Sequence, residues 1–447
     1  MNPNILFIVI DSLRADKTYD DKKTSITPYI DSLIKNGTYF TQAIAPADGT
    51  ILSLNGILNG LYPFSTGIRS KKIILKDNNL LQLCKNNSYH IYGFLPKLTS
   101  FQPIISWCEN NDNTYEAGPP TIPLSKTAKQ IINLFDSNKM LEPWFYFLHI
   151  FDLHTIREGT IPNWLDHFDD EKFGQNKYER IVSLIDFWIG KILDKIDLKK
   201  TLIILTADHG ERIPIDDKNI TSFEPELSTT VKLGKQILPQ IAHKAGGKFL
   251  SKLRKTVGTL RVAQANKNLT SYEKRSRLPH FTLSLYDESI RVPLLFSGYN
   301  ISSKIIIQQV STVDIFPTII DLLQSQSSFN FDGTSLFPFF NGKQISEKPV
   351  YLHTMPYEHL SSSDAVGIRT SHYKYFRHSR EPTKIIYLFD LKNDPLENQN
   401  IAKENPNVIV EMENMLSNMH KIDNDNKNML SEEERKIAAE LKKLGYM

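Results

Sequence analysis

The sequence predicts an α/β protein with a doubly wound, mainly parallel sheet flanked by helices, and a smaller α+β subdomain at the C-terminus. Three observations predict this class. Runs of apolar and β-branched residues, such as NILFIVI at 4–10, are typical of strands buried on both faces of a parallel sheet. Helical patterns separate these runs, as in βαβ units. After about residue 345, short segments typical of antiparallel strands replace this alternation.

The elements follow in order along the chain. A helix is expected with Thr27 as its N-cap, Pro28 at its first position and its end at Asn36-Gly37. Further strands are predicted at 89–95, 144–151, 201–206 and 292–297, and further helices at 125–138, 177–197 and 312–323. We therefore divide the chain into a larger N-terminal domain (1–345), which carries an insertion at 213–279, and a C-terminal subdomain (346–447).

Length and composition are those of an ordinary globular protein. The chain has 447 residues, 40% of them hydrophobic and 23% charged, and a net charge of +3. With only two cysteines, Cys84 and Cys108, a disulfide framework and a Cys-based zinc site are excluded. No signal peptide and no run of about 18 apolar residues is found, so the sequence predicts no transmembrane helix and a cytoplasmic location.

Acidic residues at the ends of buried strands are the strongest functional signal. Asp11 directly follows the first strand, and Asp208 and His209 follow the strand at 201–206. Ligands of open α/β sheets bind beyond the carboxyl ends of the strands. Burying a carboxylate there without a partner would cost free energy, so a partner is expected. Two carboxylates and an adjacent imidazole therefore predict a divalent-cation site, although each Asp alone could also cap the following helix.

Six segments carry a family resemblance over nearly the whole chain. In order they are NILFIVIDSLRAD, LTADHGE, LYDESIRVPLLFSG (285–298), STVDIFPTIIDLL (311–323), IYLFDLKNDPLENQNIA (386–402) and the terminal AELKKLGYM. Together they resemble the sulfatase family of the alkaline phosphatase superfamily. The resemblance implies an alkaline phosphatase/sulfatase-like fold and a metal-dependent hydrolase or transferase acting on phosphoric or sulfuric ester bonds.

The nucleophile segment departs from the sulfatase pattern. Sulfatases carry C-x-P-x-R, or Ser for Cys, which is oxidised to formylglycine and leads into T-G-x-x-P. Here the tail is the segment NGLYP at 59–63, and the family spacing of ten residues back from Gly60 falls on Thr50, without the proline or the arginine. Thr cannot be converted to formylglycine by the route used for Cys or Ser. Capping of a helix at 51–59 is the alternative role of Thr50, and Ser53 is the alternative nucleophile.

Threonine occupies this position in relatives that resemble lipoteichoic acid synthases and phosphoethanolamine transferases. That likeness implies that a metal-activated Thr50 attacks a phosphodiester and forms a covalent phospho-threonine. Since Ser12 follows Asp11 where sulfatases usually place a second acid, it also implies one metal held by Asp11, Thr50, Asp208 and His209. Mn²⁺, Mg²⁺, Ca²⁺ and Zn²⁺ all suit such mixed oxygen and nitrogen ligands.

Three further histidines are candidates for the site. His154 resembles the family histidine of H-T-P, which contacts the anionic group of the substrate, although Ile156 replaces the proline. His280 precedes LYDESIRVP where relatives place a Lys or His that faces the substrate. His149 lies within a predicted strand, where a satisfied core histidine is the favoured interpretation.

The insertion is strongly basic. Residues 228–279 hold twelve Lys or Arg and one acidic residue, Glu273, and the apolar residues around 249–260 recur at helical spacing. This pattern predicts a cationic amphipathic helix, which either packs its apolar face on the core or makes peripheral contact with an anionic surface. Near an active site the charge would concentrate an anionic small-molecule, glycan or lipid-headgroup substrate, and no nucleic acid is expected.

The function hypothesis is a metal-dependent enzyme that cleaves a phosphoester or phosphodiester through phospho-Thr50. A sulfuric ester hydrolase is the alternative that family similarity alone suggests. The missing proline and arginine also leave open a catalytically inactive homologue that binds an anionic glycan.

Overall fold

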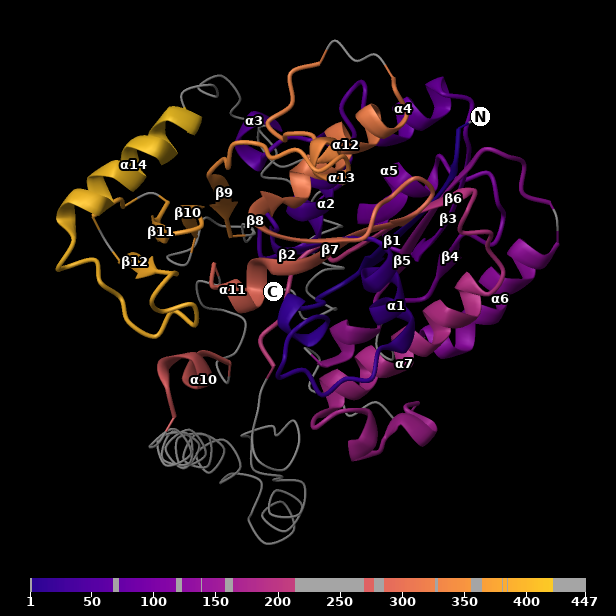
Figure 1. The fold of residues 1–447 in the computed structure, drawn as a ribbon, viewed down its shortest axis with the longest axis horizontal. Helices are drawn as coiled ribbons and strands as arrows, with labels where there is room; N and C mark the ends of the chain where they lie inside the picture. The colour runs from indigo at the N-terminus through magenta and orange to yellow at the C-terminus, as the bar shows by residue number, and fades with distance from the viewer. Residues whose placement is uncertain are drawn as a thin grey trace, which may run out of the picture.

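An eight-stranded sheet forms the centre of the computed structural model (Figure 1). The spatial order of its strands is β4-β3-β5-β1-β6-β7-β2-β8. Their bounds are β1 (Asn4–Ile10), β2 (Thr38–Ile44), β3 (His90–Pro96), β4 (Thr114–Tyr115), β5 (Trp144–Ile150), β6 (Thr201–Thr206), β7 (Arg291–Gly298) and β8 (Lys304–Ser311). Among these strands β7 alone runs antiparallel to its neighbours, so the predicted mainly parallel sheet is confirmed.

The structure describes residues 2–66, 72–117, 123–137, 139–156, 164–213, 269–276, 285–325, 329–354, 364–379, 381–383 and 385–420. Most of the basic insertion, the position of His280 and the predicted C-terminal helices beyond residue 420 lie outside these ranges. Within them, no helix combines the length and the apolar character needed to span a bilayer.

Helices cover both faces of the central sheet. The helices up to the second sheet are α1 (Pro28–Asn36), α2 (Thr50–Asn59), α3 (Pro63–Thr66), α4 (Leu80–Asn86), α5 (Gln102–Ile105), α6 (Leu124–Asp136), α7 (Lys177–Leu193), α10 (Ser271–Ser276), α11 (Asp287–Ile290), α12 (Ile315–Leu322) and α13 (Phe337–Phe340). Figure 1 shows α1, α6 and α7 on one side of the sheet and α2, α4, α12 and α13 on the other. This is the doubly wound arrangement that the sequence predicts.

The N-terminus of α1 corrects one detail of the sequence analysis. Thr27 was expected to cap this helix, yet its side chain makes no capping hydrogen bond. Asp186 of α7 instead accepts hydrogen bonds from the backbone N–H groups of Tyr29 (3.2 Å) and Ile30 (2.7 Å). A carboxylate from a neighbouring helix thus caps the N-terminus of α1. The local sequence cannot predict this cap, because Asp186 is distant along the chain.

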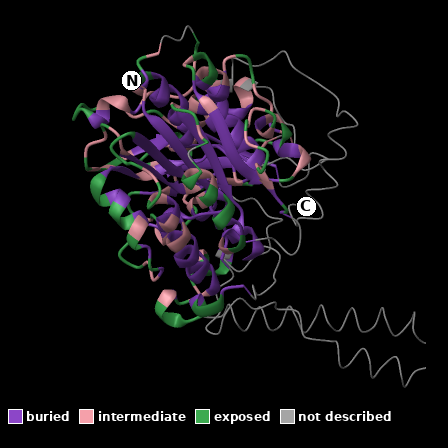
Figure 2. Ribbon diagram, turned by 90° about the vertical axis from the view of Figure 1, so that its right-hand side faces the viewer, coloured by how far each residue is buried: buried purple, intermediate pink, exposed green. Residues whose placement is uncertain are grey.

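The core lies around the central strands β5, β1 and β6, whose residues are all buried (Figure 2). Phe7 of β1 packs edge-on against Phe145 and Phe147 of β5, with ring centroids 6.2 and 5.4 Å apart. Each such side chain contributes about 1.5–3 kcal/mol on burial. The middle of the sheet is therefore a rigid platform, and the strand ends that leave it are held in place.

A second, antiparallel sheet follows in the C-terminal part of the chain. It contains β9 (Val350–His353), β10 (Ala365–Arg369), β11 (Tyr373–His378) and β12 (Ile386–Asp390), in the spatial order β12-β11-β10-β9, and α14 (Pro406–His420) contacts it. Figure 1 shows this group beside the central sheet. The smaller C-terminal α+β unit is confirmed, while the boundary at 345/346 stays a prediction.

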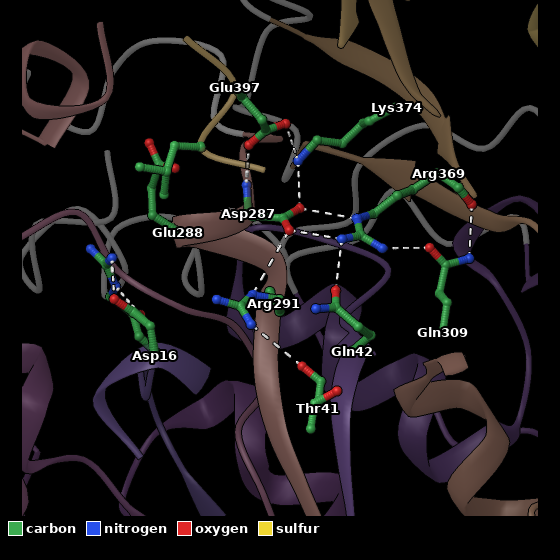
Figure 3. A network of polar contacts seen from close by, with 12 residues as sticks. Asp16, Thr41, Gln42, Asp287, Glu288, Arg291, Gln309, Arg369, Lys374 and Glu397 are labelled. Atoms are coloured by element: carbon green, nitrogen blue, oxygen red, sulfur yellow. Dashed lines mark hydrogen bonds and ion pairs between the residues drawn. The ribbon is translucent and has the colours of Figure 1, made fainter. Parts of the chain in front are cut away.

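A buried charged network joins the two sheets (Figure 3). Asp287, at the start of α11, accepts hydrogen bonds from the Arg369 Nε and Nη2 atoms of β10 (3.0 and 2.8 Å) and from Lys374 Nζ of β11 (2.7 Å). Arg369 also donates to Gln42 of β2 (2.9 Å). Burial alone would raise the pKa of Asp287, but these cations hold it well below its usual range.

Candidate metal centre

Two adjacent parallel strands bring the predicted ligands together. β1 pairs with β6, so Asp11, directly after β1, and Asp208, two residues after β6, leave the sheet at the same edge. Asp11, Asp208 and His209 each offer one ligand atom, and these three atoms lie within 4.8 Å of one another. All three side chains are 0% exposed. The geometry is what the strand-end argument predicts for a cation site.

Ser12 links the two carboxylates, a role that the sequence analysis missed. Its hydroxyl donates to Asp11 Oδ1 (2.6 Å), and its backbone N–H donates to Asp208 Oδ1 (3.1 Å). The residue has a φ of 64°, a left-handed conformation that non-glycine residues adopt at a cost. The sequence showed Ser12 only as a missing second acid, because a backbone angle leaves no mark in residue type.

His209 is held in the orientation that a metal ligand needs. Its Nδ1 lies 2.6 Å from the carbonyl oxygen of Gly210. Because a carbonyl can only accept, Nδ1 carries the proton and Nε2 keeps its lone pair for the centre of the site. This fixed tautomer is the form in which histidine binds a divalent cation.

The electrostatics of the two carboxylates fit a divalent cation between them. Burial and the negative charge of Asp208 raise the pKa of Asp11 above its ordinary value. Burial would also raise the pKa of Asp208, but its contacts with His209 and His149, among them the backbone N–H of His209 (2.8 Å), hold it well below the usual range. Asp208 Oδ2 has no hydrogen-bond partner within the described part of the chain. A buried, unpaired carboxylate oxygen beside a second carboxylate is the environment that a cation stabilises.

Thr50 points its hydroxyl at this group. Its Oγ1 donates to Asp11 Oδ2 (3.1 Å) and lies 3.3 Å from His209 Nε2. Gly49 is the N-cap of α2 and Thr50 is the first residue of the helix. The alternative prediction, that Thr50 serves as the N-cap, is therefore wrong. Ser53, the other candidate nucleophile, lies in α2, and its hydroxyl donates to the carbonyl oxygen of Ala47 (3.1 Å) in the loop before this helix.

His149 near the end of β5 and His154 after it each lie close to one of the two carboxylates. His154, in the 3₁₀ segment Asp152–Ile156, is buried and stacks on Phe151, with ring centroids 4.3 Å apart. Its Nδ1 lies 3.9 Å from Asp11 Oδ1. His149 Nε2 lies 3.9 Å from Asp208 Oδ2, so this ring faces the site, although the sequence favoured a core role for it.

Comparison with protein families agrees with this arrangement. The sulfatase family matches residues 3–325, and the family described as "N-sulphoglucosamine sulphohydrolase, C-terminal" matches residues 281–424. The first match covers well over half of the chain. The chain therefore belongs to the sulfatase family, within the alkaline phosphatase superfamily.

Curated relatives match a shorter stretch. Arylsulfatase K of Rattus norvegicus is 31% identical over 131 residues, and choline-sulfatase of Rhizobium meliloti (strain 1021) is 33% identical over 127 residues. Each alignment covers 28% of this chain and 23% of the relative. The chain thus matches less than a quarter of the length of these relatives. Membership of the family therefore does not assign their activities to this chain.

Solved structures match nearly the whole fold. Phosphonate monoester hydrolase of Agrobacterium radiobacter superposes with a TM-score of 0.64 at 14% identity, covering 94% of this chain and 95% of that one. A 2-O GAG sulfatase also gives a TM-score of 0.64, at 17% identity, with coverage of 94% and 92%. At such identities the likeness shows the fold alone.

Proposed function

We propose that the chain is a metal-dependent ester hydrolase or transferase that cleaves a phosphoester or phosphodiester through a covalent phospho-Thr50. One observation carries the proposal: the Thr50 hydroxyl lies 3.1 Å from Asp11 and 3.3 Å from His209, within the same buried group as Asp208. Asp11, Thr50, Asp208 and His209 would hold one divalent cation. When bound, it lowers the pKa of the hydroxyl and neutralises charge on the transferred group.

The residues of the chain have distinct roles in this reaction. Thr50 Oγ1 forms a bond to phosphorus while the bond to the leaving oxygen breaks, and Asp11 Oδ2, 3.1 Å away, accepts the hydroxyl proton. The N-terminus of α2, where Thr50 lies, favours the anionic group of the substrate. Water then cleaves the phospho-threonine in a hydrolase, or a second alcohol does so in a transferase. His154, beside Asp11, is proposed to contact the anionic group.

A sulfuric ester hydrolase is the second candidate, because the named curated relatives are sulfatases. The residue at the nucleophile position argues against it, since Thr50 cannot supply formylglycine. The substrate is proposed to be an anionic small molecule, glycan or lipid headgroup. The identity of the metal and the cytoplasmic location stay predictions.

A substrate screen tests the proposal. Phosphomonoesters, phosphodiesters and sulfate esters are offered with Mn²⁺, Mg²⁺, Ca²⁺ or Zn²⁺ to the wild type and to Thr50→Ala. Turnover of a phosphate ester that Thr50→Ala loses and Ser53→Ala keeps supports the proposal. Turnover of sulfate esters alone, or activity that survives Thr50→Ala, contradicts it. Metal binding without any turnover would indicate the inactive, ligand-binding form.

A further inference from the structure

His149 occupies an unusual position for a polar residue. It is the second-last residue of β5, pairs in register with Val9 of β1, and is 0% exposed. Neither of its ring nitrogens has a hydrogen-bond partner within the described residues. A buried polar group without a partner costs about 1–3 kcal/mol. An apolar side chain would fill a purely structural position without that cost.

Two aromatic rings lie beside the His149 ring. Phe101 packs edge-on against it, with ring centroids 4.9 Å apart, and Phe151 lies beyond at 6.4 Å. The hydroxyl of Tyr115 hydrogen-bonds the backbone carbonyl of His149 (2.7 Å) rather than the ring. In the direction of the metal centre, His149 Nε2 is 3.9 Å from Asp208 Oδ2.

Asp208 has one carboxylate oxygen that lacks a hydrogen-bond donor among the described residues. Its Oδ1 accepts hydrogen bonds from the backbone N–H groups of Ser12 (3.1 Å) and His209 (2.8 Å), whereas its Oδ2 has no hydrogen-bond partner among the described residues. Among the described residues, His149 lies outside the three-residue group whose ligand atoms are within 4.8 Å of one another. The contact that links it to this group is the one with Asp208 Oδ2.

We propose that His149 is a positioning residue, whose Nε2–H holds Asp208 Oδ2 in the orientation that binds the cation. The inference rests on the proposed metal-dependent function and adds a residue to its site. At 3.9 Å the two atoms are an ion-pair distance apart, and a movement of roughly 1 Å brings them to hydrogen-bond distance. Hydrogen bonds to ligating groups from outside the coordination sphere orient the ligands, and losing one weakens metal binding about 10–100-fold.

Metal titration of the full-length chain tests this role. Chelator-treated wild type and variants are titrated with Mn²⁺, and in parallel with Zn²⁺, Mg²⁺ and Ca²⁺, by calorimetry. His149→Phe keeps a ring and removes both nitrogens. His149→Gln places an amide N–H near the position of Nε2, whereas His149→Asn places one near Nδ1. Tyr115→Phe is the matched control, because it removes a hydrogen bond to the same residue and leaves the imidazole intact.

The expected result is a loss of about 10–100-fold in Mn²⁺ affinity for His149→Phe and His149→Asn, recovery in His149→Gln, and no loss in Tyr115→Phe. If His149→Phe does not fold, the comparison of Gln with Asn decides alone. Equal affinity in all folded variants, or an equal loss in Gln and Asn, overturns the role of His149. If the wild type binds none of the four cations, the proposed metal-dependent function itself is wrong.

Discussion

Gly210 allows a perturbation of the metal centre whose size the structure fixes. A Cβ added at this residue would lie 2.3 Å from the backbone carbonyl oxygen of Glu288, where real Cβ contacts essentially never fall below 3.0 Å, so the segment must shift by at least 0.7 Å. The Glu288 side is anchored, because Arg275 Nε binds the Glu288 carboxylate (3.0 Å). The shift therefore moves Gly210, whose carbonyl oxygen fixes the His209 ring.

For Gly210→Ala we expect Mn²⁺ affinity to fall by about 10–100-fold, as for loss of other hydrogen bonds that orient ligands. Overpacking should also cost about 1–3 kcal/mol of stability. Calorimetric titration measures the first quantity and urea unfolding of the metal-free chain the second. Gly190→Ala is the control, because the three atoms nearest to its added Cβ belong to the side-chain ring of Tyr29, at 2.5 Å, and not to backbone. Unchanged metal affinity in a folded Gly210→Ala variant would refute the reasoning.

Three further predictions follow from the charges of the fold. Metal at a free concentration of 100 times Kd should raise the free energy of unfolding by about 2.7 kcal/mol, so chelation should lower the melting temperature and re-addition should restore it; a melting curve indifferent to chelator and metal would count against the site. Burial raises the pKa of Asp186 to about 7, so its favourable contribution is full below about pH 4 and is lost as the pH rises through 7. Relative to wild type, Asp186→Asn should therefore gain about 2–3 kcal/mol between pH 5 and 8 in urea unfolding, and a difference that does not change with pH would contradict this. Asp287→Asn leaves Arg369 and Lys374 as buried, unpaired cations and should cost about 3–5 kcal/mol, whereas a loss below 1 kcal/mol would show that the network does not hold the two sheets together.

The parts of the fold that the sequence predicts are those with a strong local pattern. β1, β5 and β6 are continuous apolar runs, and helices of clear 3.6-residue period lie between the strands. β2 and β8 were missed because they lie toward one edge of the sheet and mix polar with apolar residues; in β8, Ile307 is 80% exposed. β4, with two residues, is too short to leave a pattern.

The candidate site divides in the same way. Asp11, Asp208 and His209 could be predicted because carboxylates at strand ends have a physical meaning in any open α/β sheet. Ser12 and His149 could not, since the first acts through a left-handed backbone angle and the second through the direction of its ring from within a strand. Both depend on which strands are neighbours, and residue type alone does not carry that information.

The covalent state of Thr50 during turnover tests the central claim most directly. The chain is incubated with metal and a phosphate ester that it turns over, quenched in acid, digested and examined by mass spectrometry over residues 48–55. The proposed mechanism predicts phosphate on Thr50 in the wild type and no phosphate at this position in the Thr50→Ala control. Formylglycine at any residue of 48–55, or turnover without phosphate on Thr50, would contradict it.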